Sequence, residues 1–149
     1  MIILTRMTEY KHLSSINEKG ESNFTTIAAG PVIIKDGKVL LDKHGDDSMW
    51  KFPGGAMEND NSFEDNAKRR VKEELGLEVE LISEAFVLTF LRQREGKDEF
   101  VVLIHFLAKI IFGQPTPGRD VTAWAWHDIN NLPADCAPNI KPVVEHFGN

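Results

Sequence analysis

The sequence predicts an α/β fold in which several strands form a central sheet and two helices pack on it. Three observations support this class. Apolar segments rich in β-branched residues recur along the chain, an amphipathic helical pattern follows a glycine turn in the middle, and a second helical pattern closes the chain. With 149 residues, of which 42% are hydrophobic, the chain has the size and composition of one domain with a buried core.

The first elements form a predicted hairpin. Residues 25–34 are rich in β-branched side chains, residues 39–41 continue the apolar pattern, and an Asp-Gly pair between them is typical of a tight turn. Residues 1–23 are polar and mixed, and we treat them as an N-terminal extension that adds either an edge strand or a helix. Residues 24–149 then form the folded domain.

A helix is predicted next, after a turn of one proline and two glycines. Asn61 or Ser62 can cap its first turn, and Gly76 suits the left-handed residue that ends many helices. The apolar residues of this segment recur every four positions: Ala67, Val71 and Leu75. One face of the helix is therefore expected to pack on the sheet.

Further strands and a closing helix follow. The strands are predicted at residues 78–82, 85–92, 100–111 and 121–126. A four-residue turn at residues 95–98 joins the second and third of these, and residues 114–119, with two prolines and a glycine, form a loop. Residues 139–147 are predicted to form the last helix, with Pro142 in its first turn.

Charge and cysteine content limit the functional classes. The formal net charge of -6 argues against general nucleic-acid binding, which needs a basic surface. It is compatible with small phosphate substrates, because a bound metal ion can supply positive charge. The single cysteine, Cys136, can form neither an internal disulfide nor a thiolate zinc site, which predicts a reducing, cytoplasmic location. No apolar segment has the length of a signal-peptide core or a membrane span, so no membrane partner is expected.

The segment from Gly54 to Leu77 carries most of the functional information. It resembles the Nudix box, Gly-x5-Glu-x7-Arg-Glu-U-x-Glu-Glu-x-Gly-U, in which U is an aliphatic residue. Seven positions match this formula with intact spacing: Gly55, Arg69, Val71, Glu73, Glu74, Gly76 and Leu77. Asn61 and Arg70 stand where the family has glutamates, so the box is degenerate.

The resemblance to the MutT-like Nudix hydrolases implies both a fold and a reaction. The fold is an α/β/α sandwich with a mixed central sheet, with the box helix on one side and the C-terminal helix on another. The reaction is metal-dependent hydrolysis of the pyrophosphate of a nucleoside diphosphate linked to another group, with water attacking a phosphorus atom. A small nucleotide is the expected partner, and a homodimer is left open.

The resemblance also implies the site residues. Glu73 and Glu74 are candidate ligands of Mg2+ or Mn2+, and the carbonyl oxygen of Gly55 completes the metal shell. Arg69 lies four residues before Glu73 and can orient its carboxylate by a charge-assisted bond. Glu73, Glu74 and Arg69 therefore make up the predicted catalytic set.

Arg70 complicates this assignment. It lies three and four residues before Glu73 and Glu74, so its guanidinium can pair with both carboxylates and take the volume of the metal. Together with the glutamate missing at Asn61, this predicts weaker metal binding.

Two interpretations stay open. In the first, acids outside the box supply a ligand or base: Asp98, Glu99 or Asp120. In the second, the protein is catalytically impaired and binds a nucleotide or a partner. A structural domain with an accidental match is disfavoured by the seven matching positions.

Substrate contacts are predicted from Trp50 and His44. Trp50 can stack on a base, although it can also serve only to anchor the glycine turn. His44 can approach a phosphate, although a solvated loop histidine is the plainer interpretation. At least one of Trp124 and Trp126 is expected in or beside the core, and His105 is expected to be a hydrogen-bonded core histidine.

Overall fold

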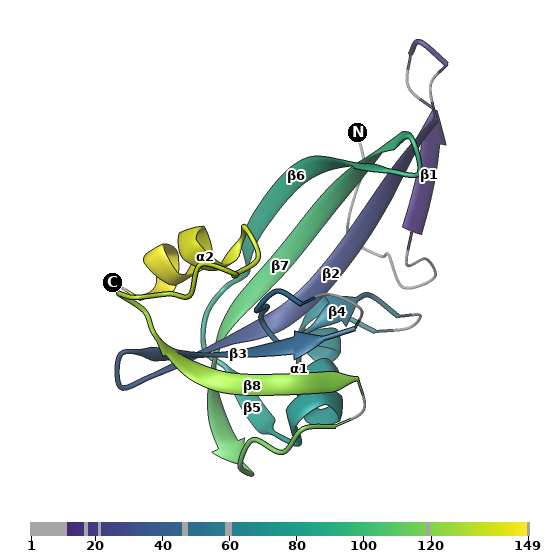
Figure 1. The fold of residues 1–149 in the computed structure, drawn as a ribbon. Coiled ribbons are helices and arrows are strands. Elements are labelled where there is room, and N and C mark those ends of the chain that lie inside the picture. Colours follow the sequence, from purple (N-terminus) through teal and green to yellow (C-terminus); the bar gives the residue numbers. More distant parts are fainter. Residues whose placement is uncertain are drawn as a thin grey trace.

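The computed structural model describes residues 12–16, 18–20, 22–45, 48–58, 61–118 and 120–148. The elements of the described chain are β1 (His12–Ile16), β2 (Ser22–Lys35), β3 (Lys38–His44), β4 (Gly55–Ala56), α1 (Phe63–Leu75), β5 (Glu78–Leu81), β6 (Phe86–Arg94), β7 (Lys97–Phe112), β8 (Val121–Asp128) and α2 (Ile140–Phe147). Figure 1 shows β2 and β7 side by side, with β3 and β8 crossing them and the two helices well apart.

The strands form a mixed sheet in the order β5-β7-β2-β3-β8, in which β1 and β4 also pair with β2, and β6 pairs with β7. β2 and β7 are parallel over residues 24–33 and 99–108, whereas the other pairs are antiparallel. The predicted mixed central sheet is confirmed.

The two faces of the sheet carry different helices. Adjacent residues of a strand point to opposite faces, and β2 shows this clearly. Ile33 packs in one core cluster with Val71 and Leu75 of α1. Val32 packs in another cluster with Val143 of α2. The predicted α/β/α arrangement, with the box helix on one side and the C-terminal helix on the other, is therefore confirmed.

Helix α1 begins and ends as predicted. The hydroxyl of Ser62 accepts a hydrogen bond from the backbone N–H of Asp65 at 3.0 Å, which caps the first turn. Gly76 ends the helix with a left-handed φ of 69°. The predicted apolar stripe is fully buried: Ala67, Val71 and Leu75.

The hairpin between β6 and β7 is tighter than the sequence suggested. The predicted turn covers residues 95–98, whereas the observed turn consists of Glu95 and Gly96 alone, with φ of 52° and 75°. Two consecutive residues with positive φ form a turn that matches strand twist, so the strands pair directly up to it. This prediction was wrong at the turn, and β7 begins at Lys97 rather than at residue 100.

The N-terminal alternative is decided for one segment. β1 pairs antiparallel with residues 22–26 of β2, so residues 12–16 form an edge strand. Residues 1–11, 17 and 21 lie outside the described chain. The division between an extension and a domain at residue 24 stays a prediction.

The predicted core histidine is confirmed. His105 is only 3% exposed, and its Nδ1 lies 2.9 Å from the carbonyl oxygen of Phe86. Its Nε2 lies 3.0 Å from Nδ2 of Asn139. Burial lowers the pKa of His105.

Trp126 packs against the core on the α1 side, as expected for at least one of the two tryptophans of β8. None of the described helices is long and apolar enough to cross a membrane.

The glycine turn before α1 lies against the backbone of β2. A Cβ atom on Gly30 would be 2.1 Å from the carbonyl oxygen of Pro53, and a Cβ atom on Gly54 would be 2.8 Å from that of Ala29. Gly54 also has a φ of 141°, which side chains other than that of glycine rarely adopt. The turn is thereby placed at a fixed distance from β2.

This contact predicts unequal effects of two glycine substitutions. Gly30→Ala should lower the free energy of unfolding by about 3 kcal/mol or more, because its methyl group collides with backbone that cannot turn away. Gly37→Ala should cost only about 1 kcal/mol, since the alanine must adopt the left-handed backbone at this position but its methyl group meets no atom within 4 Å. Urea denaturation of both variants measures the difference, and equal losses would show that the close approach at Gly30 is unimportant.

Candidate functional site

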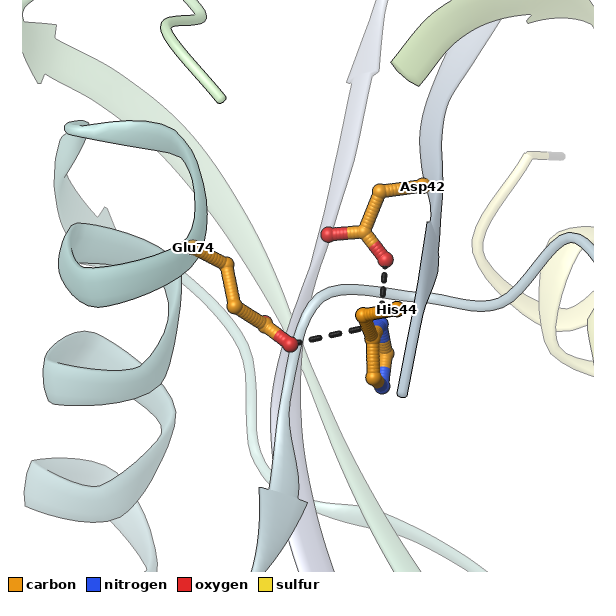
Figure 2. Close-up of side chains that lie close together, drawn as sticks. All are labelled: Asp42, His44 and Glu74. Atoms are coloured by element: carbon orange, nitrogen blue, oxygen red, sulfur yellow. Dashed lines mark hydrogen bonds and ion pairs between the residues drawn. The ribbon is translucent and has the colours of Figure 1, made fainter. Parts of the chain in front are cut away.

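The end of β3 faces the last turn of α1. The alternation of β3 places Val39 and Leu41 in the core with α2 and Leu40 in the core with α1. Asp42 and His44 continue the Leu40 face, and they meet Glu74 of α1 there. Figure 2 shows the two side chains of β3 and the helical glutamate pointing toward one another.

The three side chains form a compact cluster in which both carboxylates are buried and His44 is partly buried. Nδ1 of His44 makes a short contact with Oδ1 of Asp42 and lies 3.2 Å from Oε1 of Glu74 (Figure 2). One ligand atom from each residue can be chosen so that all lie within 4.8 Å of one another. Asp42 is fully buried and Glu74 is 4% exposed. The cluster therefore concentrates two carboxylates and one imidazole where water has little access.

Each buried carboxylate has one oxygen that is held and one that is not. Oε2 of Glu74 accepts the backbone N–H of Gly54 at 2.7 Å. Within the described chain, Oδ2 of Asp42 and Oε1 of Glu74 are buried and accept no hydrogen bond. A buried oxygen without a donor costs about 1–3 kcal/mol. These oxygens and the imidazole nitrogen are suitable ligands for a divalent cation.

The environment of Glu74 perturbs its ionisation. Burial, and secondly the Asp42 carboxylate, raise the pKa of Glu74 to about 7. His44, the Gly54 N–H and Arg70 act in the opposite direction without cancelling these effects. A carboxyl group with such a pKa, in a cavity, is typical of functional sites.

Glu73 is held from the side of the helix. Nη1 of Arg69 donates to Oε1 of Glu73 at 2.8 Å, and Nη2 donates to Oδ1 of Asn66 at 2.8 Å. Nδ2 of Asn66, a fully buried residue, donates in turn to the carbonyl oxygen of Gly55 at 3.1 Å. Glu73, whose side chain is 50% exposed, is thus linked to the glycine turn through a chain of hydrogen bonds.

Arg70 lies between the glycine turn and both glutamates. Its Nη1 is 3.6 Å from Oε2 of Glu73, and its Nη2 is 3.7 Å from Oε1 of Glu74. Nη2 also donates weakly to the carbonyl oxygen of Gly54 at 3.4 Å. A Cβ atom on Gly55 would lie 2.6 Å from the same nitrogen, so the guanidinium covers this glycine. The pairing of Arg70 with both carboxylates agrees with the sequence-based expectation.

Two cavities meet at His44. The first, of about 550 Å³, is lined by His44, Gly45, Glu58, Arg70, Glu73, Glu74 and Asp120. We call it the acidic cavity, because four carboxylates and one guanidinium line it. The second, of about 540 Å³, is mainly apolar and includes Phe52, Phe90, Val101, Leu103, Arg92 and Asn139. We call it the apolar cavity; His44 lines both.

The structure separates the acids predicted outside the box. Asp120 lines the acidic cavity. Glu99 is fully buried elsewhere, where it accepts hydrogen bonds from Arg92 and Thr26. Asp98 pairs with Gln93 in the hairpin. Of these three acids, only Asp120 lies beside Glu73 and Glu74.

The two predicted substrate residues also differ in their surroundings. His44 lines both cavities. Trp50 packs edge-on against His127 with ring centroids 4.5 Å apart, and Nζ of Lys43 lies 4.8 Å from its ring. Trp50 lines neither cavity, and its substrate role stays a prediction.

Asp42 was missed, because the predicted strand ended at residue 41, whereas β3 continues to His44. Its position does follow from the pattern of β3: a strand with Leu40 on one face places Asp42 and His44 on the same face. An acid directly after three buried apolar residues, followed two positions later by histidine, was the available signal.

Comparison with known proteins agrees with this architecture. A NUDIX domain model matches residues 25–147. The chain belongs to the NUDIX family. The predicted Nudix hydrolase assignment, MutT-like and of α/β fold, is thereby confirmed at the level of the family.

Individual Nudix relatives differ in how much they share with the chain. A MutT-like protein of Streptomyces ambofaciens is 40% identical over 53 residues, which are 36% of this chain and 34% of that protein. An ADP-ribose pyrophosphatase of Methanocaldococcus jannaschii is 29% identical over 81% of this chain and 72% of its own length. The structure of a MutT NUDIX hydrolase from Burkholderia pseudomallei superposes with a TM-score of 0.67 at 23% identity, covering 83% of this chain and 98% of that one.

Glu74 predicts a pH-dependent stability of the metal-free protein. Its pKa is about 7 in the folded state against 4.5 for the ordinary group, so the folded state binds the proton more tightly. The resulting stabilisation is complete below the lower value and is lost as the pH rises through the higher one. Between about pH 5 and about pH 8, the free energy of unfolding should fall by about 2 kcal/mol from this group.

Urea denaturation in EDTA at several pH values measures this effect. The matched variant Glu74→Gln keeps an oxygen for the Gly54 N–H but does not titrate. Its free energy of unfolding should therefore lack the fall of about 2 kcal/mol expected from Glu74. Identical pH profiles of parent and variant would contradict the assignment.

Proposed function

We propose that the protein is a metal-dependent Nudix hydrolase that cleaves the pyrophosphate of a nucleoside diphosphate linked to another group. The observation that carries this proposal is the meeting of the acidic and apolar cavities at His44. One molecule with a charged pyrophosphate beside an aromatic nucleoside can fill both. ADP-ribose is the first substrate to test, because the Methanocaldococcus jannaschii relative is an ADP-ribose pyrophosphatase.

The acidic cavity needs a cation before it can accept a pyrophosphate. Its four carboxylates repel the phosphate oxygens, and Arg70 alone does not balance them. Glu73 and Glu74 would hold Mg2+ or Mn2+, with the carbonyl oxygen of Gly55 as a further ligand. When bound, such an ion neutralises phosphate oxygens and lowers the pKa of a bound water.

The protein residues position these groups. Arg69 orients Glu73, and the Gly54 N–H orients Glu74. His44 stands between the cavities, where it can contact the phosphate nearest the nucleoside. The apolar cavity, with Phe52 and Phe90 in its wall, offers the nucleoside a surface on which to pack.

We further propose that the Nudix box of this protein is degenerate, with Asn61 and Arg70 in place of two glutamates. The contacts of Arg70 with Glu73 and Glu74 support this, because the guanidinium competes with a cation for the same carboxylates. The same contacts favour the second candidate function, an impaired Nudix protein that binds a nucleotide without hydrolysing it. In either case we place the protein in the cytoplasm, without general nucleic-acid binding.

Hydrolysis of ADP-ribose tests the function directly. In Mg2+ or Mn2+, the parent should add water across the pyrophosphate and release AMP and ribose 5-phosphate, which chromatography separates. Glu74→Gln should lower kcat/KM by about a hundredfold or more, whereas Glu64→Gln, exposed in the first turn of α1, should retain it. ADP-ribose that binds with either metal but is not cleaved would favour the binding protein. A nucleoside triphosphate serves as the comparison substrate.

Restoring the family glutamates tests the degenerate box. The double variant Asn61→Glu and Arg70→Glu should raise Mg2+ affinity by about tenfold or more, because it adds two carboxylates and removes a competing cation. Calorimetric titration measures the affinity, and Lys68→Glu, which replaces a base by an acid on the exposed side of α1, shows the effect of added negative charge away from the cavity. Equal Mg2+ affinities of parent and double variant would contradict the proposed cost of Arg70.

A further inference from the structure

We propose that Asp42 and His44 of β3 are ligands of the cation together with Glu74, and that this ligand set selects Mn2+ over Mg2+. The inference rests on the proposed function and deepens it, since it assigns the ligands that the box helix lacks. Arg70 and Asn61 leave the Nudix box with fewer carboxylates than the family formula, while β3 presents one carboxylate and one imidazole to the same space as Glu74.

The first argument is the presence of buried ligand atoms without donors. Oδ2 of Asp42 and Oε1 of Glu74 accept no hydrogen bond within the described chain, although Asp42 is fully buried and Glu74 is 4% exposed. One imidazole nitrogen, Nδ1 of His44, faces both carboxylates and can donate only one hydrogen. A divalent cation satisfies both oxygens and offsets the repulsion between the carboxylates.

The second argument is the rigidity of the backbone that presents these atoms. The N–H of Asp42 donates to the carbonyl oxygen of Lys51 at 2.9 Å, and the N–H of Lys51 donates back at 2.8 Å. On its other edge, β3 pairs with β8, where Asp42 is opposite Trp124. On α1, the Gly54 N–H fixes Oε2 of Glu74. Ligands placed on a strand and a helix hold their geometry better than ligands on loops.

The third argument is ligand chemistry. Mg2+ takes oxygen ligands almost exclusively and loses its water reluctantly. An imidazole suits the first-row transition ions, and affinity for a site with nitrogen and oxygen ligands rises from Mn2+ to Co2+. A cluster of two carboxylates and His44 therefore favours Mn2+ over Mg2+, and Co2+ can report its ligands by absorption.

Metal titration of matched variants tests the inference. Calorimetry with Mn2+ and with Mg2+ is run on the parent, Asp42→Asn and His44→Gln, with Asp128→Asn and His146→Gln as controls outside the cluster. Each cluster variant should bind Mn2+ about tenfold or more weakly, while the controls bind as the parent does. His44→Gln should reduce the preference for Mn2+ over Mg2+, because it replaces the nitrogen by an amide oxygen.

Two further measurements separate ligand loss from misfolding. Circular dichroism shows whether each variant is folded. Mn2+ should raise the Tm of the parent and controls but raise that of Asp42→Asn much less, since only a folded site that binds the ion is stabilised. The absorption of bound Co2+ should change in His44→Gln. Unchanged Mn2+ affinity and Co2+ absorption in folded Asp42→Asn and His44→Gln would overturn the inference.

The experiments distinguish failure of this ligand assignment from failure of the proposed hydrolase function. If ADP-ribose is hydrolysed while the β3 variants bind metal normally, the function stands and the inference falls. If Mn2+ binding depends on Asp42 and His44 but neither ADP-ribose nor a nucleoside triphosphate is cleaved, the ligand assignment stands and the hydrolase falls.

Discussion

The site depends on one hydrogen bond between two distant segments, from the backbone N–H of Gly54 to Oε2 of Glu74 at 2.7 Å. Gly30 lets the glycine turn lie directly against β2, and this bond then fixes the turn to α1. Because one oxygen of Glu74 is held by the turn, the other is directed to β3. Asp42 and His44 lie on that strand, on the same face as Leu40, which packs against α1.

The arrangement costs stability at the place where function is proposed. Two buried carboxylates, each with one oxygen that accepts no hydrogen bond within the described chain, repel each other, and burial together with Asp42 raises the pKa of Glu74 to about 7. A fold selected only for stability would replace one of them by an apolar side chain. Local departures of this kind are expected where chemistry is done, and here Glu74 lines the acidic cavity.

Arg70 gives the cavity its particular character. It covers Gly55, reaches the carbonyl oxygen of Gly54 and lies near both glutamates. Its positive charge therefore offsets part of the negative charge that Glu73 and Glu74 offer a cation. The ligands on β3 compensate for this in our proposal. The phosphate-binding chemistry is then shared between a helix and a strand, and the apolar cavity on the other side of His44 remains available for the nucleoside.

The sequence alone determined both helices, most of the strands and most of the box. Local signals sufficed there: the stripe of α1, its Ser62 cap and its Gly76 stop depend on neighbouring residues, and Arg69 reaches Glu73 within one helix turn. The turn at Glu95 and Gly96 was misjudged by two residues at its end, because turn geometry depends on strand register. Only the tertiary structure showed that Asp42 lies beside Glu74. It also showed that Asp98 and Glu99 lie away from the site and that Trp50 lines neither cavity. These outcomes depend on which strand packs against which helix, and contacts between residues so distant in the chain leave no periodic signal in one sequence.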